Sequence, residues 1–389
     1  MQHASPARPL LAALLLCFCF PCSSLLAADT PDTTLTAQLP GDALAPAGDA
    51  KAAAQSLYDH ADSLWKGGSP GKATQVWQSV VERFPDQREL AASSLYKIAK
   101  YYCKNHQYAE CEATINQLNQ SYPDQKKRCD DGKWVLAEAL VGEHKVAAAL
   151  AVYKALEDDP ANSLGAKAEA AASSVSCLYH EMKHKEAFEG AKAYLKNYPG
   201  GKRTDSIEMM LLESGIESGD GDSVRYVDSL LDGILDRDLK DDRRSRLMLY
   251  KAFCVKGLHG TQQAIPMFQQ IIAAYPKSVA ADEAKFHIAI HNISVRTGAT
   301  SEDDIRAIGQ KYLRNYALGY LLYKEGRHAE ALPLFASSIQ EFPKWGNGGP
   351  GADIPVRAML LSSLCWRKLG DQDRARQWVE QADAYRPAR

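Results

Sequence analysis

The sequence of 389 residues lacks several signals that mark particular classes of protein. Lysine plus arginine number 46 and aspartate plus glutamate 48, so no excess of positive charge favours nucleic acid or an anionic membrane surface as a partner. Aromatic residues make up only 8% of the chain, whereas hydrophobic residues reach 46% and charged residues 24%. This balance is typical of a globular protein and excludes a mostly disordered or collagen-like chain.

Long apolar runs are also scarce, and the one at residues 10–20 is too short to span a bilayer. It follows Arg8 and precedes small residues that end at Ala28, an order typical of a secretory signal peptide. We therefore predict a signal peptide over residues 1–28, with a retained N-terminal anchor as the alternative. No other stretch approaches the ~18 consecutive apolar residues that a spanning helix requires, so no transmembrane span is expected after cleavage.

The next segment, residues 29–50, is rich in proline, threonine, alanine and aspartate and has no apolar periodicity. Such a segment buries too little surface to offset the entropy of ordering, so we expect a flexible leader. Residues 51–389 then form the folded part of an exported protein. We expect it in the periplasm of a Gram-negative bacterium, with secretion beyond the outer membrane left open.

Cysteine is sparse, and its spacing excludes the common cysteine-based sites. Three of the nine cysteines lie in the predicted signal peptide, and none of these follows the residues of a bacterial lipobox. The other six form no CxxC pair and no zinc-type spacing. An even number permits disulfides after export, and Cys103 with Cys111 is the best candidate pair. The favoured interpretation of each cysteine is a small buried hydrophobic residue.

What the sequence does contain is a recurring mark, an aromatic or acidic residue followed by proline. The mark occurs at Phe84-Pro85, Tyr122-Pro123, Asp159-Pro160, Tyr198-Pro199, Tyr275-Pro276 and Phe342-Pro343, and the series closes at Pro387. Counting the two longest intervals as double gives about nine units with a period of about 38 residues. Self-similarity at this period indicates a solenoid of helical repeats.

Within the units, small and large residues recur at fixed distances from the proline. When the proline is position 32 of a 34-residue frame, positions 8 and 20 are mostly small and position 24 is mostly large and apolar. The unit 312–345 shows this with Gly319, Ala331 and Phe335. Small residues let two antiparallel helices approach closely, and the large residue fills the space beside them. Glycine at position 15, as Gly326, suits the end of the first helix, and the proline ends the second.

This pattern resembles the tetratricopeptide repeat. The clearest copy has seven of the family's marked residues: Leu318, Gly319, Leu322, Gly326, Ala331, Phe335 and Pro343. The resemblance extends from about residue 54 to the end, with departures in a fifth unit that has lost its proline and in the short, irregular stretch 279–311. It implies an all-α, right-handed superhelical solenoid of about nine helix pairs.

The junctions between units are similar to those of exported bacterial tetratricopeptide proteins. Tyr275-Pro276-Lys277-Ser278, followed by Ala281, Ala284 and Ile288, is one such junction. The families it resembles are the Tol–Pal coordinator and the outer-membrane assembly lipoprotein. The chain lacks the lipobox of the lipoprotein and the N-terminal coiled coil of the coordinator, so the similarity concerns their repeats.

Two short motifs have the form of catalytic signatures. His180-Glu181-Met182-Lys183-His184 is a formal zinc-binding H-E-x-x-H, but the repeat frame places it across the turn between two helices, so the histidines do not share a face. Residues 67–73 imitate a phosphate-binding loop, yet Ala73 stands where a metal-binding hydroxyl is required. We interpret both as turns, and predict no catalytic residue, metal or cofactor.

The candidate binding surface is the concave face, which the first helix of each tetratricopeptide unit lines through positions 2, 5, 9 and 12. These positions select large aromatic and basic residues: Tyr58, Trp65, Tyr96, Tyr179, Tyr316, Tyr320, Tyr323, Arg357 and Arg367. Tyrosine suits an interface because it combines a large apolar face with a polar tip and few rotatable bonds. The alternative is that these rings pack against the neighbouring unit.

These observations predict a non-catalytic scaffold that binds a protein partner, either a peptide segment or an envelope protein, in cell-envelope assembly or maintenance. The oligomeric state is left open. A first alternative is a protein that binds peptidoglycan or another glycan by stacking sugars on the same aromatics. A second is a zinc metallopeptidase acting through His180, Glu181 and His184.

Overall fold

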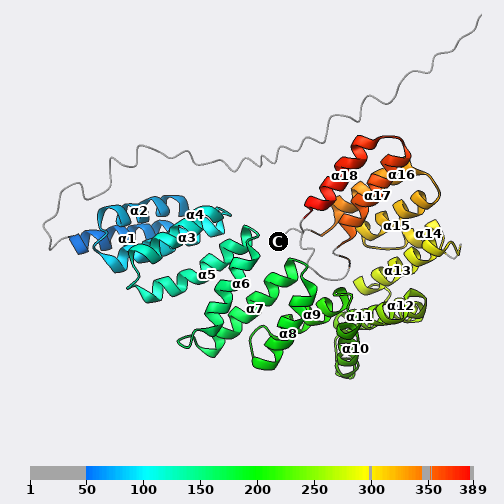
Figure 1. Cartoon of the computed structure of the whole chain (residues 1–389), viewed down its shortest axis with the longest axis horizontal. Coiled ribbons are helices and arrows are strands. Elements are labelled where there is room, and N and C mark those ends of the chain that lie inside the picture. The colour runs from blue at the N-terminus through cyan, green and yellow to red at the C-terminus, as the bar shows by residue number, and fades with distance from the viewer. Residues whose placement is uncertain (1–49, 298–299, 344–350, 352, 386–389) are drawn as a thin grey trace, which may run out of the picture.

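The computed structural model describes residues 50–297, 300–343, 351 and 353–385, and this part of the chain consists of helices and turns without a strand. The predicted signal peptide and nearly all of the predicted leader lie outside the described residues. The helices follow one another as nine pairs (Figure 1). The all-α solenoid of helix pairs expected from the sequence is therefore confirmed.

The first five pairs are α1 (Ala50–Lys66) with α2 (Pro70–Arg83), α3 (Arg88–Lys104) with α4 (Tyr108–Ser121), α5 (Lys126–Gly142) with α6 (Val146–Asp158), α7 (Leu164–His180) with α8 (His184–Asn197), and α9 (Thr204–Glu217) with α10 (Gly221–Leu235). The others are α11 (Asp241–His259) with α12 (Thr261–Ala274), α13 (Val279–Val295) with α14 (Glu302–Arg306), α15 (Lys311–Lys324) with α16 (His328–Glu341), and α17 (Ile354–Lys368) with α18 (Gln372–Ala384). The seventh pair is the irregular one, because its second helix has only five residues.

The two helices of a pair pack through the small residues that the repeat frame identified. Ala61, Ala99 and Ser363 of the first helices are buried. On the second helices Ala73, Cys111, Ala187, Ala264, Ala331 and Ala375 are buried as well. A Cβ atom at Gly319 would lie 2.9 Å from the ring of Phe335, which is itself fully buried at position 24. Close approach at the small positions is thus what lets the large residue fill the core.

In each pair, the segment between the two helices contains a residue with a left-handed backbone conformation. Five of these are glycines, at Gly68, Gly219, Gly260, Gly326 and Gly370, and four are not, at His106, His144, Met182 and Arg296. A left-handed residue ends the first helix and lets the chain reverse within a few residues. The predicted role of Gly326 is confirmed, and a residue with the same left-handed conformation occurs between the helices of all nine pairs in the described residues.

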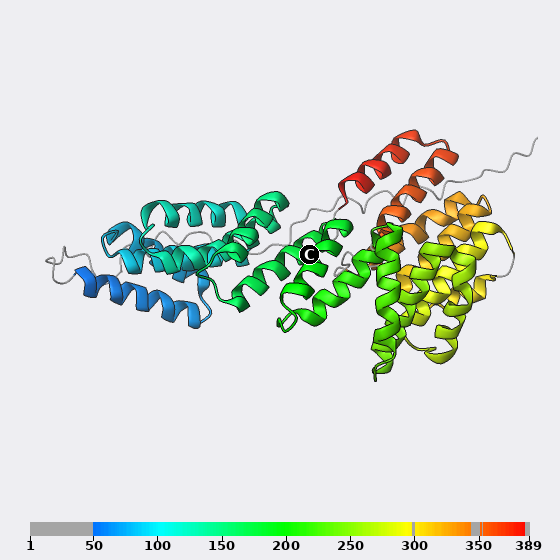
Figure 2. The same cartoon turned by 60° about the horizontal axis from the view of Figure 1, so that its bottom comes forward.

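Successive pairs stack into a curved array. First helices of neighbouring pairs contact one another along the array, except for α5 and α7, whereas second helices of neighbouring pairs have few contacts or none. The first helices therefore lie on the inner, concave side. Curvature is strongest in the C-terminal half, where α13, α15 and α17 turn back toward α9 and α11 (Figures 1 and 2).

The left-handed turn gives a direct test of the fold. We expect Gly326→Ala to lower the free energy of unfolding by about 1 kcal/mol, because an alanine at φ +80° is strained although a Cβ there would meet no atom within 4 Å. Gly200→Ala is the matched control, since a Cβ at Gly200 also meets no atom and its φ is not left-handed. Urea unfolding of the three proteins measures the difference, and equal midpoints for both variants would contradict the assignment.

Candidate binding cavity on the inner face

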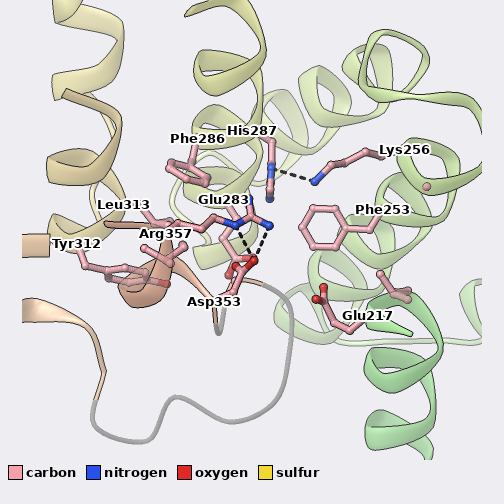
Figure 3. A pocket seen from close by; sticks show the side chains of 14 residues that line it. Glu217, Phe253, Lys256, Glu283, Phe286, His287, Tyr312, Leu313, Asp353 and Arg357 are labelled. Atoms are coloured by element: carbon pink, nitrogen blue, oxygen red, sulfur yellow. Dashed lines mark hydrogen bonds and ion pairs between the residues drawn. The ribbon is translucent and has the colours of Figure 1, made fainter. Parts of the chain in front are cut away.

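The concave side of the C-terminal half contains a cavity of about 250 Å³. Its walls come from the first helices of five successive pairs, α9, α11, α13, α15 and α17 (Figure 3). The charged and polar lining residues are Glu217, Lys256, Glu283, His287, Asp353 and Arg357, and the large apolar ones are Ile216, Phe253, Phe286, Tyr312, Leu313 and Ile354. The cavity exists because the array curves enough to bring α17 opposite α9.

An ion pair at the start of α17 lines one wall of the cavity. The Arg357 guanidinium donates from Nε to Asp353 Oδ2 at 2.6 Å, and its Nη2 lies 2.5 Å from the same oxygen (Figure 3). The two residues are four apart on one helix, a spacing that places them on the same face. Both charges are thereby satisfied within α17, so neither is free to attract a ligand at full strength.

A lysine and a histidine meet on the opposite wall. Lys256 Nζ lies 3.5 Å from His287 Nδ1, and Lys256 also sits 5.5 Å from the centre of the Phe253 ring. Burial, together with the charges of Lys256 and Arg357, holds the pKa of His287 well below its ordinary value. The imidazole is therefore neutral at physiological pH, and its Nδ1 accepts a hydrogen bond from the lysine.

Two carboxylates complete the polar lining. Glu283 is half-buried on α13, and burial, aided by the charge of Glu213, raises its pKa to about 7 against the opposing effect of Arg246. Glu217, at the end of α9, is exposed at the opening of the cavity. The surrounding walls displace enough water to raise its pKa as well, and the charge of Asp353 adds to this effect.

A half-buried carboxylate next to the cavity connects three successive first helices. Glu213 of α9 accepts hydrogen bonds from the hydroxyls of Tyr179 on α7 and Tyr250 on α11. Burial raises the pKa of both tyrosines, and the negative charge of Glu213 raises it further, so both remain protonated donors. This contact fixes the spacing of α7, α9 and α11, and with it one wall of the cavity.

A match to a known protein family covers the C-terminal helices, which include α17 on one wall of this cavity. Residues 316–388, which include most of α15 and all of α16 to α18, match the family model of the tetratricopeptide repeat. No curated protein matches the chain in sequence.

Among solved structures, the chain is similar to one titled as the APC/C hetero-tetramer Cut9–Hcn1, with 14% identity and a TM-score of 0.34 over 85% of this chain and 66% of that one. It is also similar to a monomeric mutant of IFIT1 with Gppp-AAAA, with 14% identity and a TM-score of 0.37 over 85% of this chain and 69% of that one. The chain thus spans about two thirds of the length of either structure.

In the N-terminal repeats, the aromatics predicted to line the groove lie on first helices but are half-buried. Trp65 packs 5.6 Å from Trp77 and 6.5 Å from Tyr101, and Tyr58 lies 6.5 Å from Trp77. The Arg128 guanidinium covers the Tyr96 ring at 5.7 Å. Much of each ring therefore packs between helices, and only part of it is accessible to solvent.

The tyrosines of α15 form a ladder along the eighth repeat. Tyr316, Tyr320 and Tyr323 stack in succession at centroid distances of 6.5 and 6.4 Å. Tyr316 is only 7% exposed, and Tyr179 of the fourth repeat only 3%. These two side chains therefore belong to the packing between repeats and not to an exposed binding surface, whereas Tyr320 and Tyr323 are half-buried.

The last repeat presents more of its inner face. Arg357 lines the cavity, and Arg367 is exposed further along α17. Between them Leu360 and Leu364 are 42% and 38% exposed. The repeat frame places all four at positions 2, 5, 9 and 12, so the same pattern that selected the arginines could have found these two leucines.

The cavity residues of the sixth repeat were likewise missed, although Phe253 and Lys256 occupy positions 9 and 12 of that unit. They were overlooked because the selection favoured tyrosine. Glu217, Glu283 and His287 had no such signal, because they belong to the fifth and seventh units, where the proline mark is missing or the unit is irregular.

The two catalytic-looking motifs fall at turns, as the repeat frame predicted. α7 ends at His180, α8 begins at His184, and Met182 between them is left-handed. The glycine-rich segment after Lys66 joins α1 to α2. No group of histidine, cysteine, aspartate and glutamate side chains suited to a metal ion occurs among the described residues. Among the described helices, none is both long enough and apolar enough to cross a bilayer.

All six cysteines in the described part of the chain carry free thiols, and all but Cys129 are buried. Cys103 and Cys111 lie on facing helices of the second repeat, and their thiols are close enough for the pKa of Cys111 to be raised by a hydrogen bond with Cys103 and by burial. The two cysteines are thus neighbours, as the predicted disulfide requires, and in this structure their free thiols are buried in the core of the repeat.

The raised pKa of Glu283 predicts a dependence of stability on pH. The folded protein holds this proton up to about pH 7, whereas the ordinary pKa of glutamate is 4.5, so the free energy of unfolding falls as the pH rises between these values. We expect Glu283→Gln to be more stable than the parent at pH 8, by up to about 3 kcal/mol, with no difference below pH 4.5.

Urea unfolding of the two proteins across this pH range measures the effect. Glu186→Gln, an exposed glutamate of α8 outside the cavity, is the control and should shift neither the stability nor its pH dependence. A difference between Glu283→Gln and the parent that stays constant from pH 4 to 8 would show that Glu283 is not held in a desolvated site.

Proposed function

We propose that this protein is a non-catalytic scaffold of the periplasm that binds a protein partner along the concave face of its repeats, in the assembly or maintenance of the cell envelope. Tetratricopeptide repeats imply a protein-interaction scaffold, and residues 316–388 carry them. The observation that carries the proposal is the inner face of the C-terminal half, where five first helices converge on one cavity.

The inner face has the features of a peptide-binding surface. Exposed Leu360 and Leu364 form an apolar strip on α17, and the cavity beside them holds polar groups that fix orientation. An apolar strip next to a polar pocket is how grooves in helical repeats combine affinity with specificity.

The cellular place in this proposal rests on the sequence. The apolar run at residues 10–20, with Arg8 before it and small residues after it, is the signal that supports export. The similarity of the junction at Tyr275-Pro276-Lys277-Ser278 to exported tetratricopeptide proteins supports a role in the envelope. The net formal charge of −2 gives nucleic acid no electrostatic advantage as a partner.

In-cell photocrosslinking tests the proposal. A photoreactive amino acid at Leu360 should yield a defined protein adduct, because this side chain is 42% exposed on the inner face. The same substitution at Tyr226, 41% exposed on the second helix α10, is the matched control and should yield none. Mass spectrometry identifies the adduct.

Two outcomes would contradict the proposed scaffold. Equal adducts at Leu360 and Tyr226 would show that the inner face is not the binding surface. Absence of any protein adduct, together with retention of the purified protein on isolated cell wall, would favour the glycan-binding alternative, in which Tyr320 and Tyr323 stack against sugar rings.

A further inference from the structure

The charged side chains that line the cavity differ in whether they form hydrogen bonds or ion pairs within the protein. Arg357 is paired with Asp353, and Lys256 contacts both the His287 ring and the face of Phe253. Within the described part of the chain, neither Glu217 nor Glu283 forms a hydrogen bond or an ion pair. The cations of the cavity therefore have direct partners in the protein, whereas the two carboxylates only feel cations at longer range, Glu217 those of Lys256 and Arg357 and Glu283 that of Arg246.

The net charge of the cavity also leaves negative charge uncompensated. Three carboxylates and two cations line the cavity, and His287 adds no charge because it is neutral. Of the next charges outward, Glu213 and Arg246 cancel each other, and Asp282 forms an ion pair with Lys285. When both glutamates are ionised, above the pKa of about 7 of Glu283, the cavity thus carries one net negative charge, and a single positive charge from outside would neutralise it.

The apolar walls suit a cation with a flat or slender side chain. Phe286 and Tyr312 line the cavity, and within the described residues neither ring is covered by a lysine or arginine, unlike Phe253. Aromatic faces attract ammonium and guanidinium groups when the site excludes water. At about 250 Å³ the cavity is smaller than the usual pocket for a drug-sized ligand, so it fits one side chain.

We propose that this cavity receives a basic side chain, arginine or lysine, of the bound protein partner. Glu217 meets the incoming charge at the opening, and Glu283 receives it inside, while Phe286 and Tyr312 hold the aliphatic part. The inference rests on the proposed function for the source of the side chain. It specifies the partner's chemistry: a segment with a basic anchor residue.

The residues that follow the anchor in the partner lie along α17. Leu360 and Leu364 are on the same helix face as Arg357, at spacings of three and seven residues, and both are exposed. Apolar residues of the partner cover this strip once the basic side chain is seated. A basic residue next to an apolar stretch is therefore the expected recognition sequence.

A pair of small probes tests the cavity without a partner. Nα-acetyl-arginine amide and Nα-acetyl-citrulline amide differ only in the replacement of the charged guanidinium by a neutral urea. We expect the full-length protein to bind the arginine probe about tenfold more tightly than the citrulline probe in NMR titrations at pH 8, where Glu283 is ionised, because a charge-assisted hydrogen bond is about twice as strong as a neutral one. Equal binding of the two probes, or binding of neither, would overturn the inference.

Substitutions locate the binding. Glu217→Gln and Glu283→Gln should each weaken the arginine probe about tenfold and leave the citrulline probe unchanged, since each removes one negative charge and keeps the shape. Glu186→Gln, exposed on α8, should change neither probe. Because Glu283→Gln is expected to stabilise the fold, loss of binding in it cannot be ascribed to unfolding. Undiminished binding of the arginine probe to both cavity variants would also overturn the inference.

Photocrosslinking from Leu360 separates this inference from the proposed function. If the protein adduct of the parent disappears in the double variant Glu217→Gln/Glu283→Gln, both stand. If the adduct persists in full, the inference that a basic side chain occupies the cavity is wrong, and the proposed function as a scaffold still holds. If the parent forms no adduct while the arginine probe binds selectively, the cation site remains and the protein partner is wrong.

Discussion

The whole structure depends on the close approach of two helices at small residues within each pair. Alanine, cysteine or glycine at two fixed positions leaves room for one large side chain, such as Phe335 or Trp77, which is then completely buried. The same approach requires the chain to reverse in a few residues, and a left-handed residue achieves this in every pair of the described chain. The helix pair is therefore a unit whose shape is set locally and repeated along the array.

Curvature follows from how these units stack. Contact between successive first helices, without similar contact between second helices, bends the array toward the first helices. In the C-terminal half the bend brings α17 opposite α9, so residues more than a hundred positions apart line one cavity. The ring of charges there is thus a product of the stacking geometry, and the contact of Glu213 with tyrosines of both neighbouring first helices holds one side of it in place.

Much of the fold could be predicted from the sequence, since the proline mark and the small positions are local signals. The nine pairs, the irregular seventh pair and the turn at His180 to His184 all follow from the repeat frame. The turn residues His106 and Met182 stand at position 15 like Gly326, yet they were not anticipated because histidine and methionine rarely adopt a left-handed backbone. Their conformation is imposed by the stacking of the pair.

The site was less predictable, for a physical reason. Arg357, predicted to lie on the inner face, lines the cavity, but Tyr179 and Tyr316 are buried between repeats, because large rings on a first helix also pack well against the neighbouring helix. Glu217 and Glu283 come from units that depart from the frame, and only the curved array brings their carboxylates to one cavity. A sequence pattern within one repeat does not indicate which residues come together when five helix pairs stack around one cavity.

The central claim is that the inner face of the C-terminal half is the surface that binds the partner. Hydrogen–deuterium exchange of the protein alone and in complex with a partner captured from cells tests this most directly. The account predicts slower exchange in the complex along the first helices α9, α11, α13, α15 and α17, with the second helices unchanged. Protection confined to α10, α12, α16 and α18 would contradict it, because the partner would then bind the outer face and the cavity would have no part in recognition.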